Sequence, residues 1–187
     1  MDRLGMLAPD QMTAEQRTAA QAVIDGPRGA VYGPFVPLLR SPELMDCAQR
    51  MGEYLRYRSA IGTRLSELAI LVTARAWDQQ VEWAIHAPIA ATMGIAPETI
   101  DAIAARRRPL AMDAEESAVH DFCVALHTHK RVPDREYESA LALFGEHGVV
   151  DLVGINGYYS FLAMVMNAAQ TPAPPSPAAP LPDLPPG

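Results

Sequence analysis

At 187 residues, the chain is long enough for one domain with a substantial core, and its 49% hydrophobic and 20% charged residues are typical of a globular helical protein. The formal net charge of −7 argues against nucleic acid as the main partner, because no group of Lys and Arg is dense enough to override it. No apolar run reaches about 18 residues and the first residues lack a signal-peptide pattern, so we expect no membrane span and a cytoplasmic protein.

The first third of the chain predicts two helices joined by a loop. Thr13 and Gln16 fit a capping box that opens a helix reaching about Asp25. Residues 28–40 are punctuated by Gly and Pro and are expected to form a loop. A second helix is predicted from Pro42 to about Arg58, since Ser-Pro is a favourable helix start.

Residues 63–94 predict two consecutive helices, the first capped by Thr63, with a short break near Trp77 and Asp78. The first helix carries Glu67 within an apolar stripe. The second carries Gln79, Glu82 and His86, which share one helical face because they are spaced i, i+3 and i+7. A carboxylate and an imidazole in an apolar segment are costly unless they are paired or functional. Pro88 removes a backbone donor, so a kink is expected near His86.

The remaining helices are predicted from Pro97, from Asp113 to about His129, from Asp134 to about His147, and, beyond Gly148, from Val149 to about Gln170. The last helix is apolar on most sides, so we expect it to be buried in the core and at a subunit interface. Within it, Asn156 is expected to be a satisfied buried amide, although it could instead line a pocket.

Several smaller features receive structural interpretations. The run Arg106–Arg108 is read as favourable charge near a helix C-terminus. His120, His127 and His129 lack carboxylates at ligand spacing, so no metal site is predicted. Cys47 and Cys123 lie outside any redox or metal spacing and are expected to be small core residues.

The chain is therefore divided into one helical domain, residues 1–170, and a Pro-rich tail, residues 171–187. The tail cannot form a regular helix and should be extended. It could be free, or it could lie over a neighbouring subunit, anchored by Leu181 and Leu184.

The central stretch resembles the carboxymuconolactone decarboxylase / AhpD-like family over roughly residues 28–170. Glu67, followed by Glu82, Trp83 and His86, matches the Glu-Trp-x-x-His pattern of the decarboxylase branch. The redox-active branch instead has a Cys-x-x-Cys pair whose cysteines would fall on Gln79 and Glu82, so both thiols are absent. The resemblance implies an all-α, AhpD-like orthogonal helical bundle built around a central helical hairpin. It also implies homo-oligomers, trimers or hexamers.

The resemblance also implies a site and a chemistry. His86 would be the acid/base, Glu82 would orient its imidazole, and Glu67 would support the pair. Gln79 is a further candidate pocket residue, and Trp83 would be either a packing residue or part of the pocket wall. The loop that holds Tyr32 and Phe35 approaches the pocket in the family, so these two are candidate wall residues. Alternatively, they anchor the loop in the core, and the two readings carry similar weight.

The function expected on this basis is a cofactor-independent lyase or isomerase, decarboxylase-like, acting on a small unsaturated lactone or oxo-acid, with no metal and no organic cofactor. A different class, a non-catalytic ligand-binding or oligomer-forming member of the fold, stays open. In that case Glu82 and His86 would form a buried pair that only fixes the hairpin. A peroxidase-like reductase is disfavoured because its thiolate and resolving thiol are missing.

Overall fold

The computed structural model describes residues 2–182, and in that part of the chain all regular secondary structure is helical, with no strand. One 3-10 helix precedes eight α-helices: η1 (Pro9–Gln11), α1 (Ala14–Asp25), α2 (Phe35–Leu38), α3 (Pro42–Tyr57), α4 (Gly62–Ala76), α5 (Gln80–Thr92), α6 (Pro97–Ala104), α7 (Ala114–His129) and α8 (Asp134–Ala169). The all-α prediction is confirmed.

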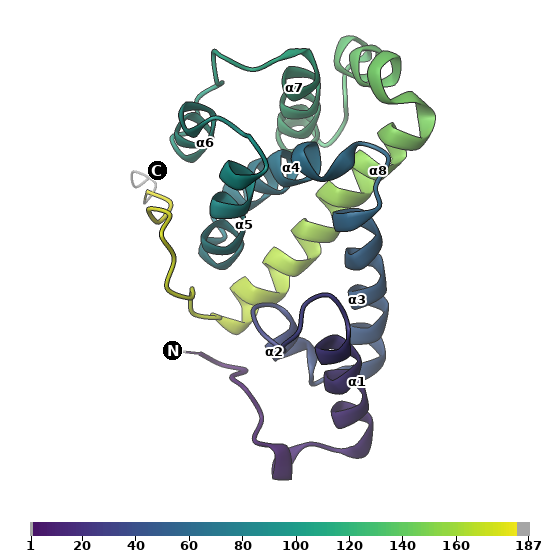
Figure 1. Cartoon of the computed structure of the whole chain (residues 1–187), viewed down its shortest axis with the longest axis vertical. Coiled ribbons are helices and arrows are strands. Elements are labelled where there is room, and N and C mark those ends of the chain that lie inside the picture. Colours follow the sequence, from purple (N-terminus) through teal and green to yellow (C-terminus); the bar gives the residue numbers. More distant parts are fainter. Residues whose placement is uncertain (1, 183–187) are drawn as a thin grey trace.

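The molecule is elongated, with α1 to α3 at one end, α6 and α7 at the other, and α8 running diagonally between them (Figure 1). Helix α4 lies in the middle and contacts α5, α7 and α8. All of its residues from Leu65 to Arg75 are buried, as expected of a helix covered on every side. The predicted central hairpin therefore forms the centre of the fold.

Local signals explain most helix starts. Thr13 and Asp113 close reciprocal capping boxes with Gln16 and Glu116, which satisfies backbone donors at the starts of α1 and α7. The predicted break between α4 and α5 is present, and Asp78 has a left-handed φ of 49° there. Helix α4, however, begins at Gly62 without a side-chain cap, so the capping role given to Thr63 is wrong.

The last helix differs from the expected pair. Helix α8 spans Asp134 to Ala169 as two helical segments joined by a kink, and the kink lies at Gly145 (φ 64°, ψ −179°), not at Gly148. A positive φ suits glycine because a Cβ would be strained there. Gly148 is buried and helical. Helix α8 is long and apolar enough to cross a membrane, but 56% of its apolar window is buried within the fold, as in the core helix of a globular protein.

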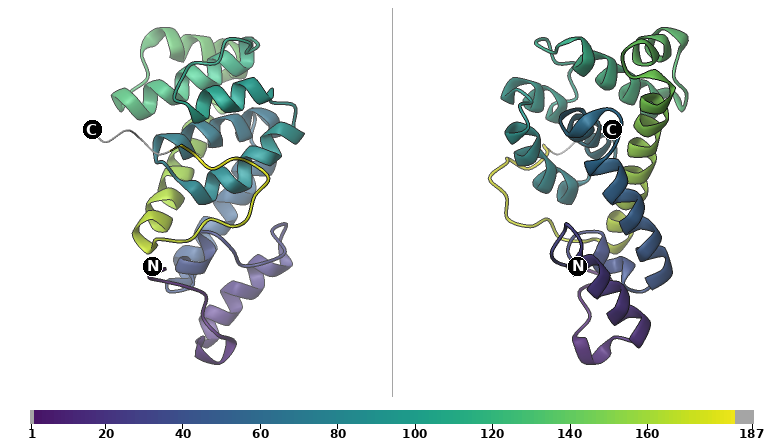
Figure 2. Two further views of the ribbon diagram at one scale, coloured as in Figure 1. Left: turned by 90° about the vertical axis from the view of Figure 1, so that its left-hand side faces the viewer. Right: turned by 45° about the vertical axis from the view of Figure 1, so that its right-hand side comes forward.

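The Pro-rich tail packs on its own chain. It has no regular secondary structure through residue 182 and crosses the outer side of α5 (Figure 2, left). Ser176 donates to the Ala84 carbonyl, and Gln80 exchanges two hydrogen bonds with the backbone of Leu181, whose side chain is buried. The tail is thus neither free nor draped only over a neighbour, and Leu184 lies outside the described residues.

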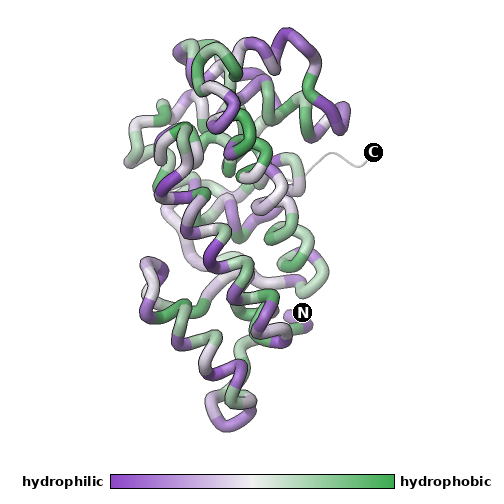
Figure 3. The backbone as a smooth tube through the Cα atoms, turned by 90° about the vertical axis from the view of Figure 1, so that its right-hand side faces the viewer, coloured by the Kyte–Doolittle hydropathy of each residue, from purple (hydrophilic) through white to green (hydrophobic). Residues whose placement is uncertain are grey.

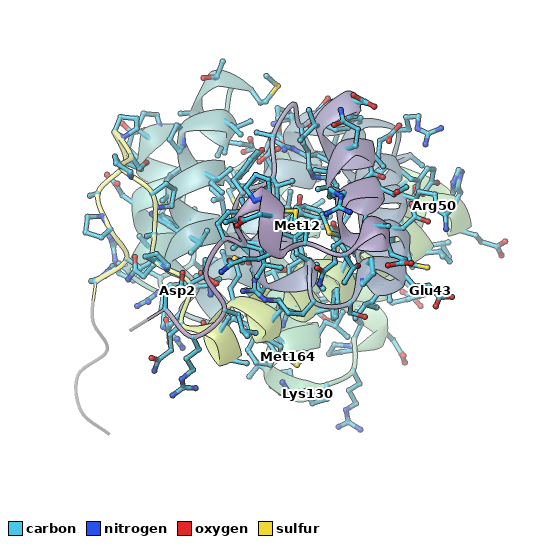
Figure 4. The ribbon with its side chains drawn as sticks, turned by 90° about the horizontal axis from the view of Figure 1, so that it is seen from below. Asp2, Met12, Glu43, Arg50, Lys130 and Met164 are labelled. Atoms are coloured by element: carbon cyan, nitrogen blue, oxygen red, sulfur yellow. The ribbon has the colours of Figure 1, made fainter. Side chains whose placement is uncertain are left out.

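Side chains sort between core and surface as the helical spacing requires. Hydrophobic and hydrophilic segments alternate along the helices in Figure 3, and Glu43, Arg50 and Lys130 point outward at the rim in Figure 4. Cys123 is buried as predicted, but Cys47 is exposed on α3, so its placement in the core is wrong. Helix α5 continues through Pro88 to Thr92.

Candidate functional site

The site is organised around a hydrogen-bonded pair of side chains from the two central helices. Nδ1 of His86, on α5, lies 2.7 Å from Oε2 of Glu67, on α4. Nε of Arg56, near the end of α3, donates to the other oxygen of Glu67 at 3.3 Å. Glu67 is 1% exposed. Burial alone would raise the pKa of Glu67, but the charges and hydrogen bonds of His86 and Arg56 outweigh it and lower that pKa.

Glu82 does not hold the imidazole, which corrects the role assigned to it. Glu82 is 2% exposed, and neither of its carboxyl oxygens has a hydrogen-bond partner. Burial raises the pKa of Glu82 well above its ordinary value. The i, i+4 spacing on α5 allowed contact between Glu82 and His86, but Glu67 on the neighbouring helix forms the bond instead.

His86, Glu82 and Arg56 face a small cavity of about 30 Å³, close to the space that one water needs. Tyr32 and Phe35 are in its wall, so the structure places both loop aromatics where a pocket role requires them. Phe35 is also in the core, and Tyr32 is partly exposed, so the two readings of the loop are compatible.

The remaining polar wall comes from residues that the sequence analysis did not single out. Arg28 precedes α2, stacks over the Phe35 ring at 4.5 Å, and has a buried Nη1 atom without a hydrogen-bond partner. The hydroxyl of Tyr158, on α8, is likewise buried and unpartnered. With Glu82, three unpartnered polar groups line one cavity, which is unusual because buried polar atoms are nearly always hydrogen-bonded.

Two adjacent tyrosines of α8 complete the wall. Tyr159 packs edge-on against the His86 ring, with 5.2 Å between ring centroids, and against Tyr158 at the same distance. Burial is the main cause that raises the pKa of Tyr158 to about 12 and the pKa of Tyr159 well above its ordinary value. Both hydroxyls are therefore protonated donors at neutral pH.

Gln79 and Trp83 do not line this cavity; Trp83 lines a different one, between α5, α6 and the Pro-rich tail. Gln79 caps α5 by accepting from the Val81 backbone, and its amide donates to Asn167. The Trp83 indole donates to the Ala179 carbonyl of the tail. These hydrogen bonds hold α5 and the Pro-rich tail that lies over it in place.

The polar residues Asn156, His120 and His127 form hydrogen bonds with neighbouring protein groups. Asn156 is a satisfied buried amide that donates to the Leu152 carbonyl. His120 bonds Asp121, and His127 bonds the Thr73 hydroxyl. Across residues 2–182, no three His, Cys, Asp or Glu side chains are grouped as a metal site would need.

Neither a family model nor a curated protein matches the sequence. Among solved structures, the chain is similar to the alkylhydroperoxidase AhpD core of an uncharacterized peroxidase-related protein from Ralstonia eutropha JMP134, with a TM-score of 0.75 and 15% identity over 92% of each chain. It is also similar to the debrominase Bmp8, solved as a cysteine-to-alanine variant with 2,3,4-tribromopyrrole, with a TM-score of 0.71 and 12% identity over 91% of each chain. The chain therefore has the fold of the AhpD core.

Proposed function

We propose that this protein is a cofactor-independent acid–base enzyme of the carboxymuconolactone decarboxylase type, acting on a small unsaturated lactone or oxo-acid. One observation carries the proposal: a buried Glu67–His86 pair lies beside the unpartnered carboxyl of Glu82, and His86 and Glu82 both line one cavity. Perturbed titratable groups that converge on a cavity favour catalysis over a purely structural role.

His86 is the proton-handling group in this proposal. Because Nδ1 is bound to Glu67, the tautomer and orientation of the ring are fixed, and Nε2 is left to exchange a proton with substrate. Glu67 is a positioning residue, braced in turn by Arg56. Glu82, kept protonated by burial, is a second acid on the same wall.

Decarboxylation would proceed by cleavage of the bond between the carboxylate carbon and its neighbour. The electron pair stays on the neighbouring carbon and spreads into the unsaturated carbonyl group as an enolate, while CO2 leaves. A proton from His86 or Glu82 then completes the product. The buried groups Nη1 of Arg28 and Oη of Tyr158 are suited to stabilise the enolate oxygen, because both line the cavity and both can donate a hydrogen bond.

A lactone ring is larger than the cavity of about 30 Å³, so the proposal requires part of the wall to move on binding. Residues 26–34, between α1 and α2, are the non-helical part of that wall and include Arg28 and Tyr32. Gly29 and Gly33 have φ values of 69° and 55°, conformations that glycine adopts easily.

The test is a screen of unsaturated lactone acids and keto acids by CO2 release, with the wild type, His86→Ala and His129→Ala. His129 is an exposed residue at the end of α7 and serves as the matched control. We expect His86→Ala to lower kcat by about 10² to 10⁴, the usual contribution of a general acid or base, and His129→Ala to have no effect. Unchanged turnover in His86→Ala would overturn the proposal.

Thiol chemistry has little support as an alternative. Cys123 is buried on α7, and burial raises the pKa of its thiol to about 12. Cys47 lies on α3, and neither cysteine lines the cavity. Peroxide turnover with a thiol donor would nevertheless count directly against the acid–base proposal.

We further propose that the protein forms a homo-oligomer, a trimer or hexamer. Val150, Val153, Gly157 and Met164 recur at helical spacing on one side of α8, and Val150 is 66% exposed. Figure 4 places Met164 on the outer surface of α8. Light scattering at micromolar concentration should give a mass several times that of one chain, and a monomer alone would contradict the proposal.

A further inference from the structure

A second cavity, about 330 Å³ in volume, lies between α4, α6 and α7 and shares no lining residue with the first. These three helices occupy the upper part of the molecule in Figure 1. Its volume is within the range of small-molecule sites. Nothing in the acid–base proposal uses it.

The cavity is basic although the chain is acidic overall. Arg75 and the run Arg106–Arg108 bring four guanidinium groups to its wall. Asp78 pairs with both Arg75 and Arg106, and Asp121 pairs with Arg108. Within residues 2–182, Arg107 has no ion pair, so two carboxylates face four guanidinium groups, in a chain whose net charge is −7.

Three of the four arginines have structural contacts, since Arg75 donates to Asp78 and to the Pro182 carbonyl. Arg106 ties the segment after α6 to Asp78 at the α4–α5 turn, and Arg108 forms a two-point ion pair with Asp121 on α7. The reading of the run as helix-end charges is therefore replaced by ion pairs between elements. Arg107 is exposed and contributes to neither contact.

Arg75 gives an independent reason to expect an anion in this cavity. This residue is 5% exposed, and its Nε atom is buried without a hydrogen-bond partner. Burial, joined by the charge of Arg106, lowers the pKa of Arg75 even though Asp78 opposes the change. An unpaired N–H of a buried guanidinium is costly, and an anion in the cavity would offset that cost.

The rest of the wall is partly apolar. Val72, Ile103 and Val124 contribute side chains from α4, α6 and α7. His120 and His127 also line the cavity, but both already hold hydrogen bonds to protein groups. The cavity thus combines a cationic rim with an apolar floor.

We propose that this cavity binds a small organic anion, with a phosphate or carboxylate group on the arginines and an apolar body against Val72, Ile103 and Val124. Guanidinium groups match the planar, two-point geometry of both anions. Arg107 is the residue free to make that contact.

Calorimetric titration of the full chain at low salt, where charge interactions are least screened, tests the proposal with three probes. Phenyl phosphate carries both the anion and the apolar body, inorganic phosphate lacks the body, and phenol lacks the anion. We expect phenyl phosphate to bind more tightly than inorganic phosphate, and phenol not to bind. Failure of phenyl phosphate to bind would overturn the proposal.

Substitutions show at which cavity phenyl phosphate binds. Arg107→Gln should weaken phenyl phosphate binding by about tenfold, the value of one charge-assisted contact, whereas Arg135→Gln, at an exposed position of α8, should have no effect. Arg28→Gln alters the acid–base cavity and should leave binding unchanged. Equal effects of Arg107→Gln and Arg135→Gln, or a loss seen only in Arg28→Gln, would refute a site at this cavity.

Discussion

Replacing Glu82 by Gln should make the free energy of unfolding fall less as the pH rises. The folded-state pKa of Glu82 is raised because the carboxyl is buried without a partner, whereas the unfolded chain has the ordinary value of 4.5. Below pH 4.5 both states hold the proton, and Glu82 does not affect stability. Above it, only the unfolded state releases the proton, so the wild type loses stability as pH rises toward the folded-state pKa. Gln cannot titrate and avoids this loss.

The size of the effect follows from proton linkage. For each pH unit above 4.5 at which folded Glu82 stays protonated, the folding equilibrium constant shifts tenfold toward the unfolded state. From pH 4.5 to pH 7 this amounts to at most about 3.4 kcal/mol, or roughly 7 to 14 °C in Tm for a chain of this length. The Gln side chain is nearly isosteric with the protonated carboxyl, so the two proteins should be about equally stable near pH 5.

The assay is thermal or urea unfolding of the wild type and Glu82→Gln from pH 5 to pH 8. The difference in unfolding free energy should grow with pH in favour of the variant. Glu138→Gln, at an exposed position of α8, is the control and should give no pH-dependent difference. If the wild type were the more stable protein at pH 8, Glu82 would be charged and paired, and the reasoning would be refuted.

Further substitutions test the packing and the ion pair around the same cavity. In Gly52→Ala, the new Cβ would lie 2.1 Å from the Tyr158 hydroxyl, so denaturant unfolding should show a loss of about 1 to 3 kcal/mol; a neutral result would mean that Tyr158 can shift. Glu67→Gln leaves the mostly buried Arg56 without its counter-charge and should lower the unfolding free energy by about 3 to 5 kcal/mol near neutral pH. Because the pKa of Glu67 is lowered in the fold, the stability that its charge supplies is present above pH 4.5 and is lost at lower pH. The unfolding free energies of the wild type and Glu67→Gln should therefore converge in acid. A difference that stayed constant with pH would contradict the pairing with His86.

Most of the helices and the candidate site residues could be predicted from the sequence because they depend on neighbours along the chain, whereas α2 lies in a segment that was expected to be a loop. The capping box predicted at Thr13 consists of local hydrogen bonds and is present, and a second capping box closes the helix start predicted at Asp113. Glu67 and His86 stand out as ionisable groups in apolar helices, which is visible without coordinates. The break in α8 was misplaced because both Gly145 and Gly148 offered one, and only the backbone conformation distinguishes them.

Which groups meet was decided by tertiary structure alone. Helical spacing made Glu82 the expected partner of His86, yet the packing of α4 against α5 brings Glu67 to the imidazole and leaves Glu82 facing the cavity unpaired. Arg28 and Tyr158 join that cavity from segments 130 residues apart, and no local pattern links them. Periodicity fixes the face on which a side chain lies, but the partner across that face depends on how whole helices pack, which is a property of the complete core.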